Sequence, residues 1–187
     1  MEIQKLKNKN IVLGVTGGIA CYKSATLINL LIKQGANVFV IMTKNATEFI
    51  TPLTLRSLSK NPVVTDMFIA PDSFEIEHIS LAKKADLFLI APATANIIGK
   101  VASGIADDML STTIMATTAP TLFAPAMNTN MYLNKIVQSN ITKLTEYGYY
   151  FIQPAVGMLA CGDEGIGKLA DLQEIVAKVI ELIGEKV

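Results

Sequence analysis

Short apolar runs of strand length alternate with helical patterns along most of the 187-residue chain. These runs are apolar on both faces, which is typical of parallel strands that helices cover on either side. The alternation therefore predicts repeated βαβ units and a doubly wound, three-layer α/β/α domain with a parallel sheet, of Rossmann-like (flavodoxin-like) type. The predicted strands are residues 10–15, 37–42, 86–91, 121–124 and 149–152.

Helices are expected between and after these strands. The first, at about 19–34, follows Gly17-Gly18 and stops at Gly35. Pro52 interrupts the segment at about 48–58, where a second helix is expected, and a closing amphipathic helix at about 171–182 begins at Asp171. Since no linker or repeat divides the chain, residues 1–187 are expected to form a single domain.

The composition narrows the possible functions. Sixteen Lys and Arg balance sixteen Asp and Glu, 51% of residues are hydrophobic and the mean hydropathy is +0.42, which excludes a disordered chain. Without a basic cluster, nucleic acid is not an expected partner. The N-terminus has no secretory pattern, and two distant cysteines with a single histidine give no metal-ligand spacing. We therefore expect a cytoplasmic protein with free thiols and no metal site.

From Met109 to Asn134 the chain has no charged residue. This stretch is not a membrane span, because serine, threonine, proline and asparagine recur through it. It is therefore expected to be buried in the fold, in a subunit contact or against a ligand.

In a doubly wound sheet, ligands bind beyond the carboxyl ends of the strands, so the residues that follow each strand are candidate site residues. Gly17-Gly18-Ile19 follows the first strand and could receive a phosphate, although a tight turn explains the glycines equally well. G-x-G-x-x-G and P-loop patterns are absent, which disfavours a dinucleotide or a nucleoside triphosphate and leaves a mononucleotide phosphate open. Thr43 and Thr94-Ala95-Asn96 follow the next two strands, and the small residues around Asn96 would admit a flat ligand.

Two later segments hold further candidates. Asn128 could bind a carboxylate without neutralising it, which suits a decarboxylation, or it could only cap the next helix. The glycine-rich segment 153–170 is expected to be an irregular, flexible loop that could close over a site. Cys161 in this loop could donate a proton, although lone cysteines are more often buried hydrophobes. His78 could be catalytic or structural.

Taken together, these segments resemble the homo-oligomeric flavin-containing cysteine decarboxylases over about residues 11–170. The most specific are Pro92-Ala93-Thr94-Ala95-Asn96, Pro125-Ala126-Met127-Asn128-Thr129-Asn130-Met131 and the loop that holds Cys161. The nearest likeness is to members that convert phosphopantothenoylcysteine to phosphopantetheine in coenzyme A biosynthesis. The sequence departs from the family pattern at Ile97, Tyr132 and Lys168, where threonine, tryptophan and arginine are common.

The resemblance implies FMN as the cofactor and implies a role for each candidate. His78, Asn128 and Cys161 would be catalytic, with Asn128 on the substrate carboxylate and Cys161 as the acid of a substrate clamp at about 153–170. FMN would bind at Gly17, Gly18, Ile19, Thr43, Thr94, Ala95 and Asn96. The substrate would also contact Met131, Ala160 and Lys168.

Family members build the flavin site between the subunits of a trimer, so the resemblance implies a trimer or a dodecamer of trimers. The charge-free stretch 109–134 would then be buried by both the fold and the partner. Some relatives are fused to a phosphopantothenoylcysteine synthetase domain, which is therefore a possible fused or separate partner.

The implied reaction begins with oxidation of the substrate's cysteine moiety to a thioaldehyde, followed by loss of carbon dioxide and re-reduction. Three alternatives stay open. A peptidyl-cysteine decarboxylase of lantibiotic maturation would be expected to differ from the A-C-G-x-x-G-x-G pattern at 160–167, and a flavin prenyltransferase relative would not need the Cys161 loop. A non-catalytic flavin-binding regulatory subunit would not need His78, Asn128 and Cys161 together.

Overall fold

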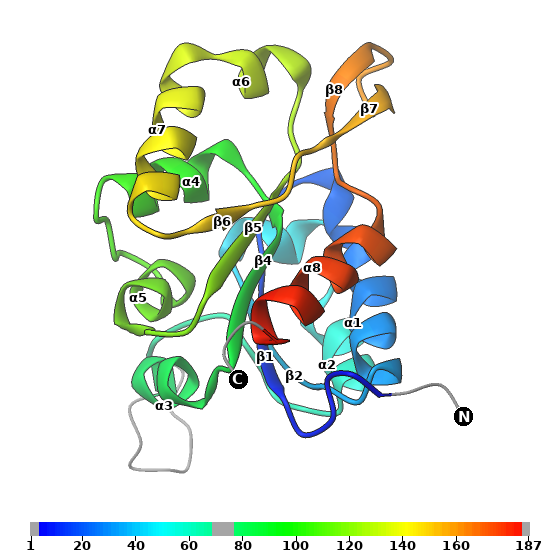
Figure 1. Ribbon diagram of the computed structural model, residues 1–187, viewed down its shortest axis with the longest axis vertical. Helices are drawn as coiled ribbons and strands as arrows, with labels where there is room; N and C mark the ends of the chain where they lie inside the picture. The colour runs from blue at the N-terminus through cyan, green and yellow to red at the C-terminus, as the bar shows by residue number, and fades with distance from the viewer. Residues whose placement is uncertain (1–3, 69–76, 185–187) are drawn as a thin grey trace.

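The sheet at the centre of the computed structural model is six-stranded, and the structure describes residues 4–68 and 77–184. The strands run in the order β3-β2-β1-β4-β5-β6 and every neighbouring pair is parallel (Figure 1). This is the strand order of Rossmann folds, so the predicted doubly wound domain is confirmed. The strands are β1 (Asn10–Val15), β2 (Asn37–Met42), β3 (Val63–Val64), β4 (Leu87–Ala93), β5 (Thr121–Pro125) and β6 (Tyr150–Phe151).

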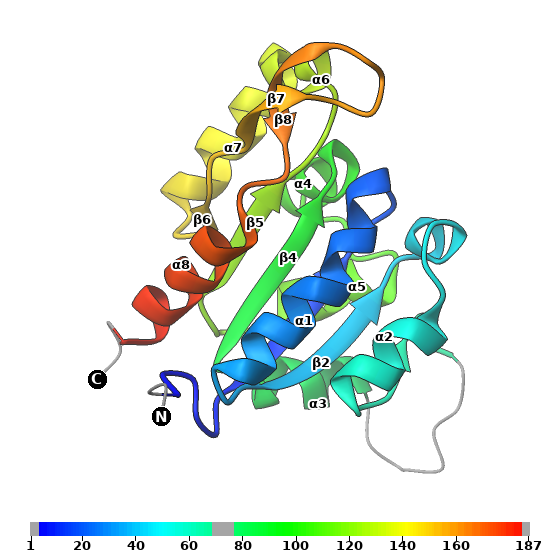
Figure 2. The ribbon, with the colours of Figure 1, turned by 90° about the vertical axis from the view of Figure 1, so that its right-hand side faces the viewer.

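Helices form a layer on each face of this sheet. One layer, in front of the sheet in Figure 2, consists of α1 (Lys23–Lys33), α2 (Pro52–Ser59) and α8 (Leu172–Gly184). The opposite layer consists of α3 (Glu77–Lys84), α4 (Ala95–Ala102), α5 (Met109–Ala116) and α7 (Lys135–Glu146). The 3₁₀ helices η1 (Ile19–Tyr22) and η2 (Lys44–Glu48) and the short helix α6 (Thr129–Leu133) follow strand ends.

The central strands face two hydrophobic cores, one under each helical layer. Leu13 of β1 lies in the core under α1 and α8, whereas Val12 lies in the other core, and both are fully buried. Gly14 lets α5 approach β1 closely, because a Cβ atom at this position would lie 2.5 Å from Leu110 Cδ1. The strand ends therefore belong to a sheet that is tightly packed on both faces.

Two segments differ from the sequence-based expectation. The helix expected from about residue 48 begins at Pro52, because proline suits the first turn and the Thr51 hydroxyl accepts a hydrogen bond from Thr54 N. The segment 153–170, expected to be an irregular loop, forms an antiparallel hairpin of β7 (Ala155–Met158) and β8 (Glu164–Lys168). Its glycines are mostly strand residues that allow close packing, so the prediction of an irregular loop is wrong.

The charge-free stretch 109–134 covers α5, β5 and α6. The fold itself buries β5 and most of α5, which accounts for the lack of charge there. In α6, however, Met131 is 49% exposed and Leu133 is 57% exposed. Within the described ranges 4–68 and 77–184, no helix has the length and apolar character needed to cross a bilayer.

Candidate active site

The sheet reverses its winding direction between β1 and β4, which are neighbours although β2 and β3 lie between them in sequence. Thr16, directly after β1, is buried; its hydroxyl donates to Pro92 O at 2.7 Å and accepts from Thr94 N at 3.1 Å. These hydrogen bonds fix the ends of β1 and β4 relative to each other. In open α/β sheets this reversal point is where ligands bind.

A cavity of about 610 Å³, here called the sheet-edge cavity, opens beyond the ends of β1, β2 and β4. The hydroxyl of Thr43 accepts a hydrogen bond from Ala46 N and that of Thr94 accepts one from Ile97 N, so both threonines also cap helices. The predicted cofactor residues on its wall are Gly17, Thr43, Thr94, Ala95 and Asn96.

A second cavity of about 680 Å³, here called the hairpin cavity, lies next to the first. The start of α1, the segment before α6 and the β7–β8 hairpin form its wall. Gly17, Thr94 and Met131 line both cavities, so the two spaces adjoin. The other predicted residues on its wall are Gly18, Ile19, Asn128, Ala160, Cys161 and Lys168.

The turn after β1 suits a bound phosphate. Gly17 is required for packing, because a Cβ atom there would lie 2.4 Å from Asn45 Cβ, whereas a Cβ atom at Gly18 would come no closer than 3.8 Å to its nearest neighbour. No side chain caps η1 within the described part of the chain, which leaves backbone N–H groups at its start for an anion. Both cavities also have volumes typical of cofactor sites, so these residues fit a mononucleotide.

Asn128 and Cys161 meet across the hairpin cavity. Asn128 Nδ2 donates to Cys161 Sγ at 3.5 Å, and the thiol donates to Asp163 Oδ2 at 3.4 Å. Asn128 Oδ1 accepts from Asn130 N at 2.8 Å, so this residue caps α6 and also presents its amide to the hairpin. Cys161 is exposed, which rules out the interpretation of a buried hydrophobe. The arrangement places an amide donor and a thiol acid at one point.

The hairpin sits on the segment before α6 through glycine. Met127 N donates to Gly167 O at 2.9 Å, and a Cβ atom at Gly167 would lie 2.2 Å from Met127 O. At Gly165 a Cβ atom would lie 2.4 Å from Thr129 Oγ1, a buried hydroxyl oxygen without a hydrogen-bond partner in the described structure. Any larger residue at either glycine would push the hairpin away from its seat.

Two departures from the family pattern have local explanations. Ile97 is buried in the core on the α4 and α5 face of the sheet, so its side chain serves packing. The Tyr132 hydroxyl donates to Gln153 Oε1 at 2.8 Å and thereby links α6 to the segment that leads into β7. Burial raises the pKa of Tyr132, which keeps this phenol a hydrogen-bond donor.

An ion-pair cluster stands at the edge of the sheet-edge cavity. Lys100 Nζ lies 2.6 Å from Asp107 Oδ1 and 2.7 Å from Asp108 Oδ2. Asp108 also caps α5 by accepting from Ser111 N at 2.8 Å. Burial opposes the charged form of Asp108, but Lys100 and the Ser111 hydrogen bonds outweigh it and hold the pKa of this carboxyl below its usual value. The cluster fixes α4 to the start of α5.

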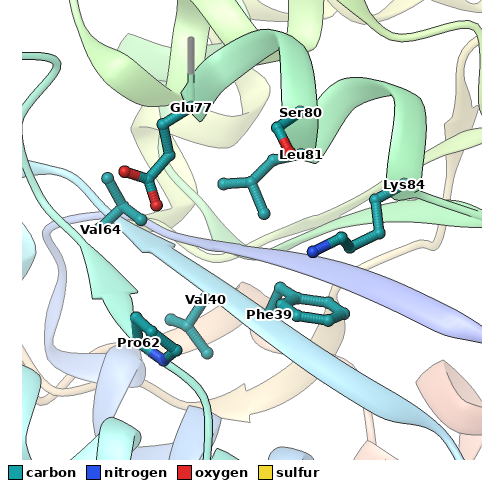
Figure 3. A pocket seen from close by; sticks show the side chains of 8 residues that line it. All are labelled: Phe39, Val40, Pro62, Val64, Glu77, Ser80, Leu81 and Lys84. Carbon is teal, nitrogen blue, oxygen red and sulfur yellow. The ribbon is translucent and has the colours of Figure 1, made fainter. Parts of the chain in front are cut away.

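His78 lies apart from the other predicted catalytic residues. It is on α3, and it is not on the described wall of either cavity. Between α3 and the β2–β3 edge there is a smaller cavity of about 170 Å³, into which Glu77 and Lys84 project (Figure 3). Lys84 Nζ lies 4.6 Å from the Phe39 ring centroid there. Within one chain, His78 is therefore not in the cavity that Asn128 and Cys161 line.

Sequence reasoning missed several residues of the site. Lys23, at the start of α1, lines the hairpin cavity, and Asp163 contacts the Cys161 thiol. For Lys23 the signal was its position five residues after Gly18, and for Asp163 it was the position two residues after Cys161. The described residues contain no group of three or more potential metal ligands.

Known proteins similar to this chain agree with this geometry. It is 51% identical to the coenzyme A biosynthesis bifunctional protein CoaBC of Borreliella burgdorferi, over 96% of the chain and 46% of that protein, and 52% identical to CoaBC of Bacillus subtilis, over 91% and 42%. The chain thus spans about half the length of these relatives. It is 51% identical to a probable phosphopantothenoylcysteine decarboxylase of Streptococcus mutans, over 92% of the chain and 98% of that protein.

A solved structure has a similar fold. It is a PPC decarboxylase with a cysteine-to-serine mutation, complexed with pantothenoylaminoethenethiol; it has a TM-score of 0.86 and 31% identity, over 96% of this chain and all of that one. The family model described as Flavoprotein matches residues 2–184. The chain therefore belongs to the flavoprotein family.

Proposed function

We propose that this protein decarboxylates phosphopantothenoylcysteine to phosphopantetheine, a step of coenzyme A biosynthesis, with FMN as cofactor. The observation that carries the proposal is the contact of the Asn128 amide with the Cys161 thiol, in a cavity that adjoins the sheet-edge cavity. The S. mutans relative supports the substrate, because the similarity extends over nearly its whole length. Similar FMN-dependent cysteine decarboxylases support FMN as the flavin.

The cofactor would be held by residues that the fold already places together. Gly17, Gly18 and Ile19 offer backbone N–H groups for its phosphate, and Thr43 with Thr94, Ala95 and Asn96 would hold the rest along the sheet edge. Bound FMN supplies a reversible two-electron oxidation of the substrate's cysteine moiety. The remaining work, binding and proton transfer, falls to side chains of this chain.

Asn128 and Cys161 divide that work. The neutral Asn128 amide binds the substrate carboxylate without a compensating positive charge, so the carboxylate keeps its tendency to leave as carbon dioxide. The bond to the departing carbon breaks and its electron pair passes to the oxidised carbon–sulfur group of the substrate. Cys161 then donates its proton to the substrate carbon. The Asn128 N–H that points at Sγ is placed to stabilise the resulting thiolate.

We further propose that a neighbouring copy supplies His78. In one chain this histidine lies outside both cavities, while apolar side chains next to the site are exposed: Tyr22 is 58% and Leu133 57% exposed. A trimer, or a dodecamer of trimers, with the site between subunits would cover these side chains and complete the site.

The alternatives are less well supported. The peptidyl-cysteine decarboxylase EpiD is only 22% identical, at a TM-score of 0.79, so it shares the fold alone. A flavin prenyltransferase would have no use for the hairpin acid, and a regulatory subunit would have no use for the contact between Asn128 and Cys161. The free thiols Cys21 and Cys161 support a reducing, cytoplasmic setting. A synthetase, fused or separate, would supply the substrate.

The function is tested by incubating purified, flavin-loaded protein anaerobically with phosphopantothenoylcysteine and following carbon dioxide release and product mass. Wild-type protein should form phosphopantetheine. Cys161→Ser should retain the flavin and still release carbon dioxide. It should accumulate an enethiol two hydrogens lighter than phosphopantetheine, because serine does not supply the proton that Cys161 donates to the substrate carbon. Normal turnover by Cys161→Ser would contradict the role of the thiol as acid.

Mixed oligomers extend the same assay to His78. We expect His78→Asn and Cys161→Ser to be inactive separately, but their random hybrids to regain roughly a quarter of the wild-type rate if each site draws the two residues from different chains. Unmixed variants combined without subunit exchange are the control. No recovery in verified hybrids would reject the shared site.

A further inference from the structure

The charged side chains on the described wall of the hairpin cavity are both lysines, and the carboxylate next to this wall, that of Asp163, is in contact with the Cys161 thiol. Lys23 and Lys168 line this cavity, and no Asp or Glu does so among the residues that the structure describes. Neither lysine forms an ion pair within ranges 4–68 and 77–184. Two unpaired cations beside one concave space raise the local concentration of anions and favour a ligand with negative charge.

Each of the two lysines is positioned by its element. The side chain of Lys168, in β8, extends over Gly157 of β7. A Cβ atom added at Gly157 would lie 3.8 Å from Lys168 Cδ and 3.9 Å from Lys168 Nζ. Lys23 is the first residue of α1, whose first turn has no acidic side chain, so the positive end of the helix dipole adds to its charge. One cation thus belongs to the helix and the other to the hairpin.

The sheet-edge cavity has the opposite character. Its described wall holds three carboxylates, Asp66, Asp107 and Asp108, against two lysines, Lys44 and Lys100, and Lys100 is already paired with two of these carboxylates. A phosphomonoester carries between one and two negative charges at neutral pH and is more favourable next to unpaired lysines. Of the two adjoining cavities, the hairpin cavity is therefore the better site for a second phosphate, in addition to the one at Gly17–Ile19.

On the basis of the proposed function, we propose that Lys23 and Lys168 bind the terminal phosphate of the substrate while Asn128 and Cys161 engage its cysteine end. The protein would then select a phosphorylated cysteine conjugate over the same conjugate without phosphate. Lysines suit this task because the ammonium group is a compact charge with three rotatable N–H donors, which can donate to phosphate oxygens from several directions. Closure of the hairpin would complete the phosphate site, because Lys168 moves with it.

The test compares phosphopantothenoylcysteine with pantothenoylcysteine as substrates of the flavin-loaded enzyme. Lys23→Met and Lys168→Met should each lower kcat/KM for the phosphorylated substrate by roughly 10- to 100-fold, mainly through KM, and should lower kcat/KM for the other substrate much less. Calorimetry with phosphopantothenate and pantothenate, which need no turnover, should show the same selective loss of binding. Lys23→Arg and Lys168→Arg should restore most of the preference.

Lys135→Met is the matched control, because Lys135 also begins a helix, α7, but lies outside both cavities and should leave the preference intact. Equal losses for both substrates, or loss of bound FMN in Lys23→Met, would overturn the proposal, since the lysines would then serve structure or the flavin phosphate. Equal kcat/KM values of the wild-type protein for both substrates would reject this inference alone. Turnover of neither compound would reject the proposed function itself.

Discussion

The strand ends and the β7–β8 hairpin both line the hairpin cavity, but they are held in different ways. At the strand ends, buried side chains bridge the loops: Thr16 connects β1 to β4, and Ser24 Oγ of α1 donates to Ala91 O at 3.0 Å. The hairpin is held to the segment before α6 by the backbone hydrogen bond from Met127, the hydrogen bond between Asn128 and Cys161, and glycine contacts, and Val156 and Met158 are 70% and 64% exposed.

This difference separates two tasks. Groups that hold a cofactor benefit from a rigid support, because small displacements weaken every contact at once. A proton donor that must meet the substrate and then release the product needs an element that opens at low cost in free energy. The candidate acid Cys161 stands on the weakly held element and the candidate cofactor residues stand on the rigid one.

Gly167→Ala is expected to have the largest effect, because it should displace the hairpin and leave the strand ends in place. The new methyl group would collide with Met127 O, and φ at this residue is +139°, so the hairpin should leave its seat. Decarboxylation should fall roughly 100-fold, as expected for a misplaced catalytic group, while FMN binding is retained. Steady-state kinetics and flavin absorbance measure the two effects.

Gly162→Ala controls for backbone strain, because φ at Gly162 is also positive, at +89°, but a Cβ atom there would meet nothing within 4 Å. It should reduce activity much less than Gly167→Ala. Parallel loss of FMN in Gly167→Ala would show that the hairpin and the strand ends are not independent.

Thr129→Val should have a smaller effect of opposite sign. The buried Thr129 hydroxyl has no hydrogen-bond partner in the described structure, and an apolar group of similar shape removes that cost. We expect the free energy of unfolding to rise by roughly 1 kcal/mol, measured by urea denaturation, and the hairpin to be cleaved more slowly by protease. Thr129→Ser, which keeps the hydroxyl, should not be stabilised; a destabilised Thr129→Val would mean that the hydroxyl is in fact satisfied.

Asp108→Asn probes the rigid side and should have the smallest effect. Asparagine preserves the helix cap of α5 but removes the ion pair with Lys100, so we expect a loss of less than about 1 kcal/mol at pH 7. The pKa of Asp108 is lower in the folded than in the unfolded protein. Its charge therefore stabilises the fold above the unfolded pKa, about 3.9, and this contribution is lost as the pH falls through the folded value.

The measurement is thermal unfolding of wild type and Asp108→Asn between pH 7 and pH 3. The gap in stability between the two proteins should stay constant down to about pH 4 and shrink below it. A gap that widens on acidification would contradict the assigned direction of the pKa shift.

A feature of this structure can be predicted from the sequence when the residues that form it are close together in the chain. Apolar runs such as 10–15 and 37–42 predict buried strands, because burial on both faces leaves a local signature. The rule that ligands bind at strand ends then identifies Thr43 and Thr94–Asn96. Ile19, Asn128 and Cys161, which are far apart in sequence, line one cavity.

The misses involve contacts without a local pattern. The glycines of segment 155–168 are typical of a loop in sequence, but Gly165 and Gly167 pack against Thr129 and Met127, more than 25 residues away, in a hairpin. Lys23 acquires its role from a cavity that three separate elements enclose. His78 lies outside both cavities of one chain, and its proposed role depends on a contact between chains, for which a single sequence has no local pattern.

The hydrogen bond between Tyr132 and Gln153 gives the hairpin the geometry of a lever. The base of the hairpin, here called the stem, is formed by the buried residues Leu169 and Ala170 on one side and by Gln153 on the other, and the hairpin would rotate about a point near Gln153. From there to Met158 an extended strand measures about 17 Å, so a stem rotation of about 10° moves the tip by about 3 Å. That displacement is nearly the whole distance between Asn128 and Cys161. Mutations in the stem, far from the hairpin tip, would therefore change the separation of Asn128 and Cys161.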